Sequence, residues 1–143
     1  MVAVKEIMHG VTRVPALMSV FEVAQIMERK NIGSVLIEAD GEISGIITER
    51  DLLTRIVARA ADPQRIKVRE IMNPLKYTID EEADILDASH IFQKFDIRRL
   101  PVTRSGKIVG IITTRDIAKA VPYALSARIT RMHALEETHP LDY

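Results

Sequence analysis

The stretch GIITERD at residues 45–51 returns 65 positions later as GIITTRD at residues 110–116. A second matching pair stands earlier in each copy, with VKEIM at residues 4–8 and VREIM 64 positions later at residues 68–72. The difference of one position indicates a single insertion around residues 73–78. Two similar units in so short a chain predict a body with a pseudo-two-fold axis, in which a site on one unit has a counterpart on the other.

The composition is that of an ordinary soluble globular protein. The chain has 143 residues, of which 47% are hydrophobic and 28% charged, enough for one domain-sized body with a proper core. Lysine plus arginine equals aspartate plus glutamate, 20 each, so no overall field favours nucleic acid. The absence of cysteine excludes disulfides and thiolate metal sites, and the four histidines form no tightly spaced pair.

Several classes of function are not expected from these residues. The chain offers no Cys–His or Ser–His arrangement that spacing supports and no carboxylate cluster like a two-metal site, so catalysis is not expected. No apolar run approaches the roughly 20 residues of a membrane helix, and the first residues lack a signal-peptide pattern. We therefore expect a cytoplasmic protein that is no enzyme and binds neither nucleic acid nor a membrane.

The first copy reads as β-α-β-β-α. Ser19 and Glu22 have the spacing of a capping box, and the helix they open carries an apolar stripe at Val20, Val23, Ala24 and Met27. Asp40-Gly41 is a hairpin signal between two apolar runs. The predicted strands are residues 11–14, 35–37 and 43–47. A second helix is predicted over residues 48–60, with Leu52, Leu53, Ile56 and Val57 facing the core.

The second copy repeats this order. Its strands are predicted at residues 77–80, 100–102 and 108–112. Asp84 opens a helix whose inward residues are Ile85, Ala88, Phe92 and Phe95, and Thr113 opens the last repeat helix. Residues 123–135 are predicted as a further helix, followed by a polar tail.

Three ordered stretches carry a family resemblance: the opening VKEIM or VREIM, the middle IRRLPV at residues 97–102, and the closing GIITERD or GIITTRD. Each copy resembles a cystathionine-β-synthase-type (CBS) domain, and the resemblance covers about residues 4–121. It implies an α/β (α+β) fold of two β-α-β-β-α CBS repeats packed about a pseudo-two-fold axis, plus a C-terminal helix or tail. The expected segments are repeat 1 at residues 4–60, a connector at 61–67, repeat 2 at 68–121 and the C-terminal segment at 122–143.

The resemblance implies a regulatory module. Tandem CBS repeats commonly bind adenosine-containing ligands in two clefts, so AMP, ADP or ATP is expected, with S-adenosylmethionine as another candidate. Such modules usually dimerise into a flat disc, which implies a homodimer and an unidentified regulated protein. The alternative is a dimerisation or interaction scaffold that binds no ligand and docks its partner through the segment from Tyr123 on.

The repeated Thr-x-x-Asp has two interpretations. Thr48 with Asp51, and Thr113 with Asp116, have the pattern of a helix N-cap with an acid in the first turn. A helix start also offers amides to an anion. In CBS domains this aspartate accepts hydrogen bonds from ribose hydroxyls. We favour a dual role, more strongly for Asp116 than for Asp51. His9 lies near the opening motif and is not expected to be a main contact.

Arginines distinguish the two copies. Arg98 and Arg99 precede the Leu100-Pro101 strand, where CBS domains often carry a basic residue that contacts phosphate, while the first copy has Gly33-Ser34 there. Arginine suits phosphate because its planar fork pairs with two oxygens at once. We therefore predict unequal sites, with the second copy binding phosphate-bearing adenosine compounds better.

The early strands complete the two predicted sites. Thr78-Ile79 and Arg13-Val14 occupy positions where CBS domains hold adenine, and Pro15 removes an amide from the first copy. The favoured contacts in the second copy are Thr78, Ile79, Arg98, Arg99, Leu100, Pro101, Thr113, Arg115 and Asp116. The weaker contacts in the first copy are Arg13, Val14, Gly33, Ser34, Val35, Thr48 and Asp51.

Overall fold

A computed structural model describes residues 1–120, so the predicted C-terminal helix and tail at residues 122–143 lie outside the described residues. The chain forms two compact units. The central unit comprises Val11–Lys76, and the composite unit comprises Met1–Gly10 together with the chain from Tyr77 on. The first ten residues therefore pack with the second copy of the repeat and not with their own.

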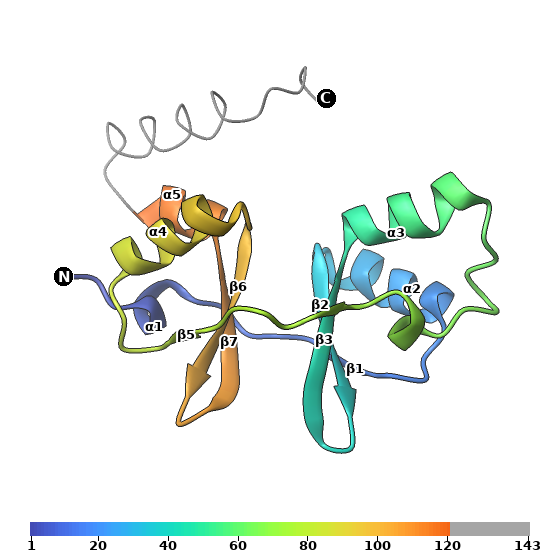
Figure 1. The fold of residues 1–143 in the computed structure, drawn as a ribbon, viewed down its shortest axis with the longest axis horizontal. Helices are drawn as coiled ribbons and strands as arrows, with labels where there is room; N and C mark the ends of the chain where they lie inside the picture. Colours follow the sequence, from blue (N-terminus) through green and yellow to red (C-terminus); the bar gives the residue numbers. More distant parts are fainter. Residues whose placement is uncertain (121–143) are drawn as a thin grey trace. The chain divides into compact units, whose positions relative to one another are not determined.

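The central unit is a four-stranded sheet with helices on one side (Figure 1). The sheet order is β1-β2-β3-β4, with β1 parallel to β2 and the other neighbours antiparallel. Its strands are β1 (Arg13–Pro15), β2 (Ser34–Ala39), β3 (Glu42–Thr48) and β4 (Asn73–Pro74). Its helices are α2 (Val20–Lys30), α3 (Glu49–Arg55) and the 3-10 turns η1 (Val57–Arg59) and η2 (Val68–Glu70).

The composite unit repeats the design with a three-stranded sheet (Figure 1). The sheet order is β5-β6-β7, with β5 parallel to β6 and β6 antiparallel to β7. Its strands are β5 (Ile79–Asp80), β6 (Arg99–Arg104) and β7 (Lys107–Thr113). Its helices are α1 (Val4–Ile7), α4 (Ile85–Phe95) and α5 (Thr114–Ala120). The mixed α/β architecture predicted from the sequence is confirmed.

The start of α2 and both hairpin turns form at the residues from which the sequence predicts them. Ser19 caps α2 by accepting a hydrogen bond from the Glu22 amide at 3.2 Å. Asn31 and Asp96 end α2 and α4 in the left-handed region, each at φ 51°. Both hairpin turns have two residues with positive φ, Asp40-Gly41 and Ser105-Gly106. That geometry matches the twist of antiparallel strands and needs a glycine or a small polar residue.

Each opening motif completes the core of one unit through main-chain bonds. The Val4 amide donates to the Ala83 carbonyl at 2.8 Å, and Val4 is fully buried in a cluster with Phe92 and Leu100. The matching residue Val68 donates to the Met18 carbonyl at 2.8 Å and is fully buried in the central core. The opening motif of each copy thus belongs to the unit that holds the other copy's helices.

A glycine on β3 and another on β7 each leave room for a methionine of the opening motif packed beside that strand. A Cβ atom built at Gly45 would lie 2.7 Å from the Met72 sulfur and 2.7 Å from the Asn73 carbonyl oxygen. At Gly110 the nearest atom would be the Met8 sulfur, also at 2.7 Å. The missing side chain is therefore what lets the opening and closing motifs lie against each other.

Three sequence predictions about the helices need correction. The helix predicted over residues 48–60 ends at Arg55, and a separate 3-10 turn follows. Ile56 is buried with Leu52 packed against the core, but Leu53 and Val57 are 59% and 69% exposed. Because Leu53 and Val57 each follow a core-facing residue by one position, they lie about 100° further round the axis and leave the core face.

Phe95 is also more exposed than its spacing predicts. It is 39% exposed, whereas Ile85, Ala88 and Phe92 of the same helix are buried as expected. Its ring stacks on Tyr77, with the ring centroids 4.1 Å apart. Phe95 thus packs on an aromatic side chain at the edge of the core and not inside it.

Candidate functional site

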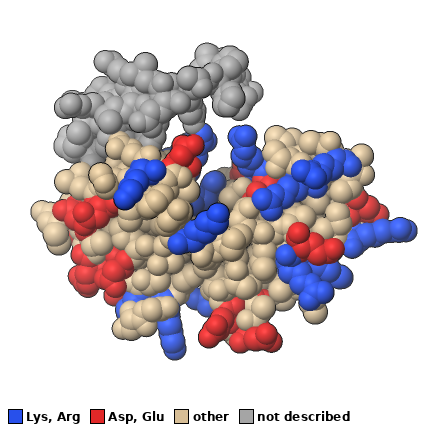
Figure 2. Space-filling view, viewed as in Figure 1, with Lys and Arg blue, Asp and Glu red and all other residues tan. Residues whose placement is uncertain are grey.

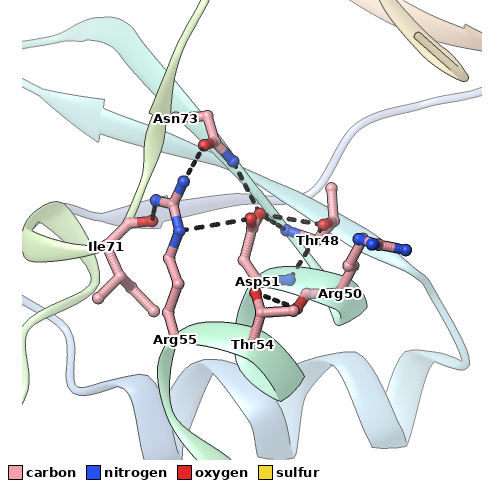
Figure 3. A network of polar contacts seen from close by, with 7 residues as sticks. All are labelled: Thr48, Arg50, Asp51, Thr54, Arg55, Ile71 and Asn73. Atoms are coloured by element: carbon pink, nitrogen blue, oxygen red, sulfur yellow. Dashed lines mark hydrogen bonds and ion pairs between the residues drawn. The ribbon is translucent and has the colours of Figure 1, made fainter. Parts of the chain in front are cut away.

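The carboxylate of Asp51 lies at the centre of a polar network in the central unit (Figure 3). Its Oδ2 atom accepts from the Thr48 amide at 2.8 Å, from the Thr48 hydroxyl at 3.0 Å and from the Asn73 side-chain amide at 2.8 Å. Thr48 in return accepts from the Asp51 amide. The predicted N-cap is therefore present, and the aspartate is 8% exposed.

Arg55 closes this network from the next turn of α3. Its guanidinium donates to the Ile71 carbonyl and, at 2.7 Å, to the Asn73 side-chain oxygen. Its Nε atom lies 3.8 Å from Asp51 Oδ1. Both carboxylate oxygens of Asp51 thus have partners within the protein, and Figure 3 shows the Arg50 side chain turned away from them.

The carboxylate of Asp116 is held differently in the composite unit. Its Oδ2 atom accepts from the Thr113 amide at 2.8 Å and lies 3.1 Å from His9 Nε2. The Thr113 hydroxyl accepts from the Asp116 amide at 3.1 Å, so the cap is the same. Within residues 1–120, Oδ1 of Asp116 makes no hydrogen bond or ion pair, and the side chain is 20% exposed.

The two networks differ at two equivalent positions. His9 pairs with Ile111 across the sheet edge as Asn73 pairs with Ile46, so histidine replaces asparagine. Arg55 has Ala120 as its counterpart 65 positions later. Within residues 1–120, the composite unit therefore has a carboxylate with one unpartnered oxygen beside an imidazole, whereas the central unit has a carboxylate closed by arginine and asparagine.

Backbone pairing brings the two arginines of the second copy to the start of α5. The Thr114 amide donates to the Arg98 carbonyl at 3.0 Å, and Arg99 pairs with Thr113 in the sheet. The central unit has the same pairing with Gly33 and Ser34 in place of the arginines. The asymmetry in cations that the sequence predicts is thus located beside the two aspartates.

The other predicted contacts divide into buried and exposed residues. Arg13, Thr78 and Arg115 are exposed, and Arg99 is half-buried. The side chains of the predicted strand contacts are buried in the sheet and helix packing, so they offer a ligand mainly backbone groups: Val14, Val35, Ile79, Leu100 and Pro101.

The helix-start amides are partly occupied. Glu49 and Thr114 at the first turns donate to Gly33 and Arg98 carbonyls, and each aspartate amide donates to its threonine. An anion at these starts would therefore compete with main-chain bonds. In the composite unit a polar ligand would therefore meet the Asp116 carboxylate and the arginines at the start of β6 more readily than the helix-start amides.

An ion pair that the sequence did not predict joins the residue after β5 to the last residue of β6. Arg104 donates to both carboxylate oxygens of Glu81, at 2.6 and 2.9 Å. The hydrogen bond from Arg104 lowers the pKa of Glu81, and the same bond raises the pKa of Arg104. Lys5 of α1 pairs with Glu82, whose hydrogen bond raises the pKa of Lys5. Because the partners are over 20 residues apart in sequence, spacing gave no sign of either pair.

Charge of both signs is spread over the visible face in Figure 2, in line with the equal numbers of acidic and basic residues. Among residues 1–120 no three histidine, cysteine or acidic side chains gather as a metal site would require. Over the same residues no helix is both long and apolar enough to cross a bilayer.

The family model for the CBS domain matches residues 4–58 and residues 68–123. The chain belongs to the CBS domain family. Both copies of the sequence repeat are CBS domains, and the resemblance drawn from the three ordered stretches is confirmed. CBS-pair proteins serve as regulatory or interaction modules.

The sequence relatives carry few functional descriptions. An uncharacterized protein of Methanopyrus kandleri is 36% identical over 119 residues, which are 81% of this chain and 60% of that longer protein. Hypoxic response protein 1 of Mycobacterium tuberculosis is 31% identical over 124 residues, 85% of this chain and 87% of that protein.

Solved structures confirm the fold. Hypoxic Response Protein I, solved with two coordinated zinc ions, has 29% identity and a TM-score of 0.72, covering 85% of this chain and 100% of that chain. A hexameric CBS-CP12 protein from bloom-forming cyanobacteria has 26% identity and a TM-score of 0.79, covering 87% of this chain and 74% of that chain.

Proposed function

We propose that this CBS pair is a regulatory module that binds an adenosine nucleotide, AMP, ADP or ATP, beside Asp116 of the composite unit. The observation that supports this most is the state of the Asp116 carboxylate. One oxygen is fixed by the Thr113 amide and His9, while the other has no partner within residues 1–120. A fixed carboxylate with an open oxygen is suited to accept hydrogen bonds from ribose hydroxyls.

The arginines supply the second half of the proposal. Arg98 and Arg99 stand at the start of β6, and main-chain bonds tie them to Thr113 and Thr114, two and three residues from Asp116. A nucleotide whose ribose meets Asp116 would bring its phosphate toward this basic strand start. Arginine is the side chain best suited to pair with phosphate oxygens.

We propose one nucleotide for each chain. In the central unit both oxygens of Asp51 are engaged, and Arg55 already balances its charge. A ribose there would have to displace hydrogen bonds to Asn73 and Thr48. The first copy therefore binds nucleotide weakly or not at all, the inequality that the sequence predicts, here for the further reason that its aspartate is internally satisfied.

Calorimetric titration with AMP, ADP and ATP tests this proposal. We expect a stoichiometry near one for at least one of the three. Asp116→Asn should weaken binding by roughly 10- to 100-fold, the size of a hydrogen bond to a charged group. The matched change Asp51→Asn should leave affinity within roughly twofold. Absence of binding to all three nucleotides by the folded protein, or equal losses in the two variants, would refute the proposal.

The proposed module carries out no chemistry and acts on a partner in the cytoplasm. Binding transmits a signal only if the nucleotide prefers one arrangement of the protein over another. A change in homodimer arrangement is the route that we favour. Analytical ultracentrifugation with and without nucleotide tests it, and identical sedimentation in both conditions would count against this route.

A scaffold without a ligand is the second candidate. Five apolar side chains of the described residues are about three-fifths exposed or more: Met1, Leu17, Leu53, Val57 and Leu86. Exposed apolar surface of this kind is available for contact with another protein chain. A thermal-shift panel without nucleotide stabilisation, together with a stable oligomer in solution, would favour this function over nucleotide sensing.

A further inference from the structure

We propose that His9 is a positioning residue for Asp116 that makes nucleotide affinity depend on pH. The inference rests on the proposed function, since it concerns regulation of the same site. It starts from one contact, the 3.1 Å separation between His9 Nε2 and Asp116 Oδ2. This contact is with the aspartate, so the effect that we assign to His9 acts through the carboxylate.

Both ring nitrogens of His9 face acceptors. Nε2 lies 3.1 Å from the Asp116 carboxylate, and Nδ1 lies 3.3 Å from the Gly10 carbonyl oxygen. Neutral imidazole carries one N–H and satisfies one of these acceptors, whereas imidazolium donates to both. Only a doubly protonated ring can donate to both acceptors at once, and histidine is the side-chain type whose ordinary change of charge falls near neutral pH.

The other charged groups near this pair lie on α1, α5 and β7 and at the start of β6, where Arg98 and Arg99 are joined through the main chain to Thr114 and Thr113. On α5, Asp116 is the group in contact, and Arg115 and Lys119 are exposed. On α1, Lys5 pairs with Glu82, and Glu6 accepts from the Ala3 amide. The partner strand β7 carries a single charged residue, Lys107, at its opposite end from Asp116. His9 is 53% exposed, so protons reach it freely.

In the central unit the position equivalent to His9 is held by Asn73, which does not titrate. Asn73 donates to Asp51 at 2.8 Å with a side chain that does not titrate, and Arg55 keeps a permanent positive charge nearby (Figure 3). The composite unit has Ala120 in place of that arginine. Of the two aspartates, Asp116 is the one whose surroundings change charge with pH.

The direction of the effect follows from charge. Neutral His9 and ionised Asp116 together carry one negative charge, and imidazolium cancels it. A nucleotide phosphate is anionic, so it binds more tightly to the site with protonated His9. One unit charge at a partly screened distance from phosphate predicts roughly a fivefold change in affinity. Because the complex favours the protonated ring, nucleotide binding is accompanied by proton uptake.

The test is calorimetric titration of AMP into the wild type, His9→Asn and His90→Asn at about pH 6 and about pH 8. Asparagine at position 9 reproduces the contact of Asn73 without a titratable ring, and His90 is an exposed histidine on α4 that serves as control. The AMP phosphate also titrates near pH 6, but this contribution is common to all three proteins. Repeating each titration in buffers of different ionisation enthalpy measures the protons taken up.

We expect the ratio of the AMP affinity at the lower pH to that at the higher pH to be roughly fivefold larger in the wild type and in His90→Asn than in His9→Asn. The additional proton uptake on binding should be absent from His9→Asn. AMP binding by all three proteins with the same pH dependence would overturn the role of His9 and leave the proposed function standing. No binding of AMP, ADP or ATP by the wild type at either pH would overturn both.

Discussion

Each opening motif packs in the unit formed by the other copy, and a pair of valine-to-alanine variants tests this arrangement. Val4 and Val68 occupy the same position in the two copies, and both are fully buried. Val4→Ala should destabilise the composite unit, with loss of protection in residues 77–120, although Val4 lies in the first copy of the sequence. Val68→Ala should destabilise the central unit, with loss of protection in residues 11–66, although Val68 opens the second copy.

The magnitude follows from the atoms removed. Each change deletes two methyl groups from a closed core, at about 0.8 kcal/mol of transfer free energy for each. The cavity left behind adds to this, so we expect a loss of about 2–3 kcal/mol. In the amides that exchange by opening of the affected unit, that loss raises the exchange rate roughly 30- to 150-fold.

Hydrogen exchange followed by mass spectrometry measures where the loss occurs. In Val4→Ala the protection of α4, β6 and β7 should fall, while α2, β2 and β3 stay near wild type; Val68→Ala should give the reverse. Val57→Ala, at a side chain that is 69% exposed, is the control and should change neither unit. Faster exchange confined to residues 11–66 in Val4→Ala, or equal changes in both units, would refute the reasoning.

Three further predictions concern contacts within the individual units. Gly45→Ala should cost about 2–3 kcal/mol in urea unfolding and more than Gly110→Ala. A new Cβ at either position meets a methionine sulfur at 2.7 Å, but the nearest backbone oxygen is 2.7 Å away at Gly45 and 3.1 Å away at Gly110; equal costs would contradict this. Arg55→Ala should lower stability by about 1–3 kcal/mol through the unpaired Ile71 carbonyl, and an unchanged unfolding midpoint would disprove that. Arg104→Gln should lower the melting temperature most at neutral pH. Since the pKa of Glu81 is lowered in the folded state, its contribution is present above the unfolded pKa and is lost as pH falls below about 4, so the difference should shrink there; a difference that is constant with pH would count against the ion pair.

Features that depend on neighbours along the chain could be predicted. The duplication, the order of elements, the Ser19 cap and the two hairpin turns follow from short-range patterns, and the structure shows them. The same is true of the threonine caps before Asp51 and Asp116, because a cap joins residues three positions apart.

Helix faces were predicted less well. The apolar stripes of α2 and α4 place their buried residues correctly apart from Phe95 and the partly buried Ala24, but α3 has apolar residues on more than one side. A pattern with adjacent leucines does not say which of the two faces the sheet. Packing against the sheet selects Leu52 over Leu53, and that choice is made by tertiary structure.

The sequence by itself determined that the protein has two CBS domains with a threonine and an aspartate at each, and that Arg98-Arg99 in the second copy stand where the first copy has Gly33-Ser34. The tertiary structure alone decided that His9 meets Asp116, that Asn73 and Arg55 close around Asp51, and that each opening motif fills the unit of the other copy. The physical reason is sequence separation. His9 and Asp116 are over 100 residues apart, so no periodicity links them, and only the hydrogen bonds of a folded sheet bring the imidazole to the carboxylate.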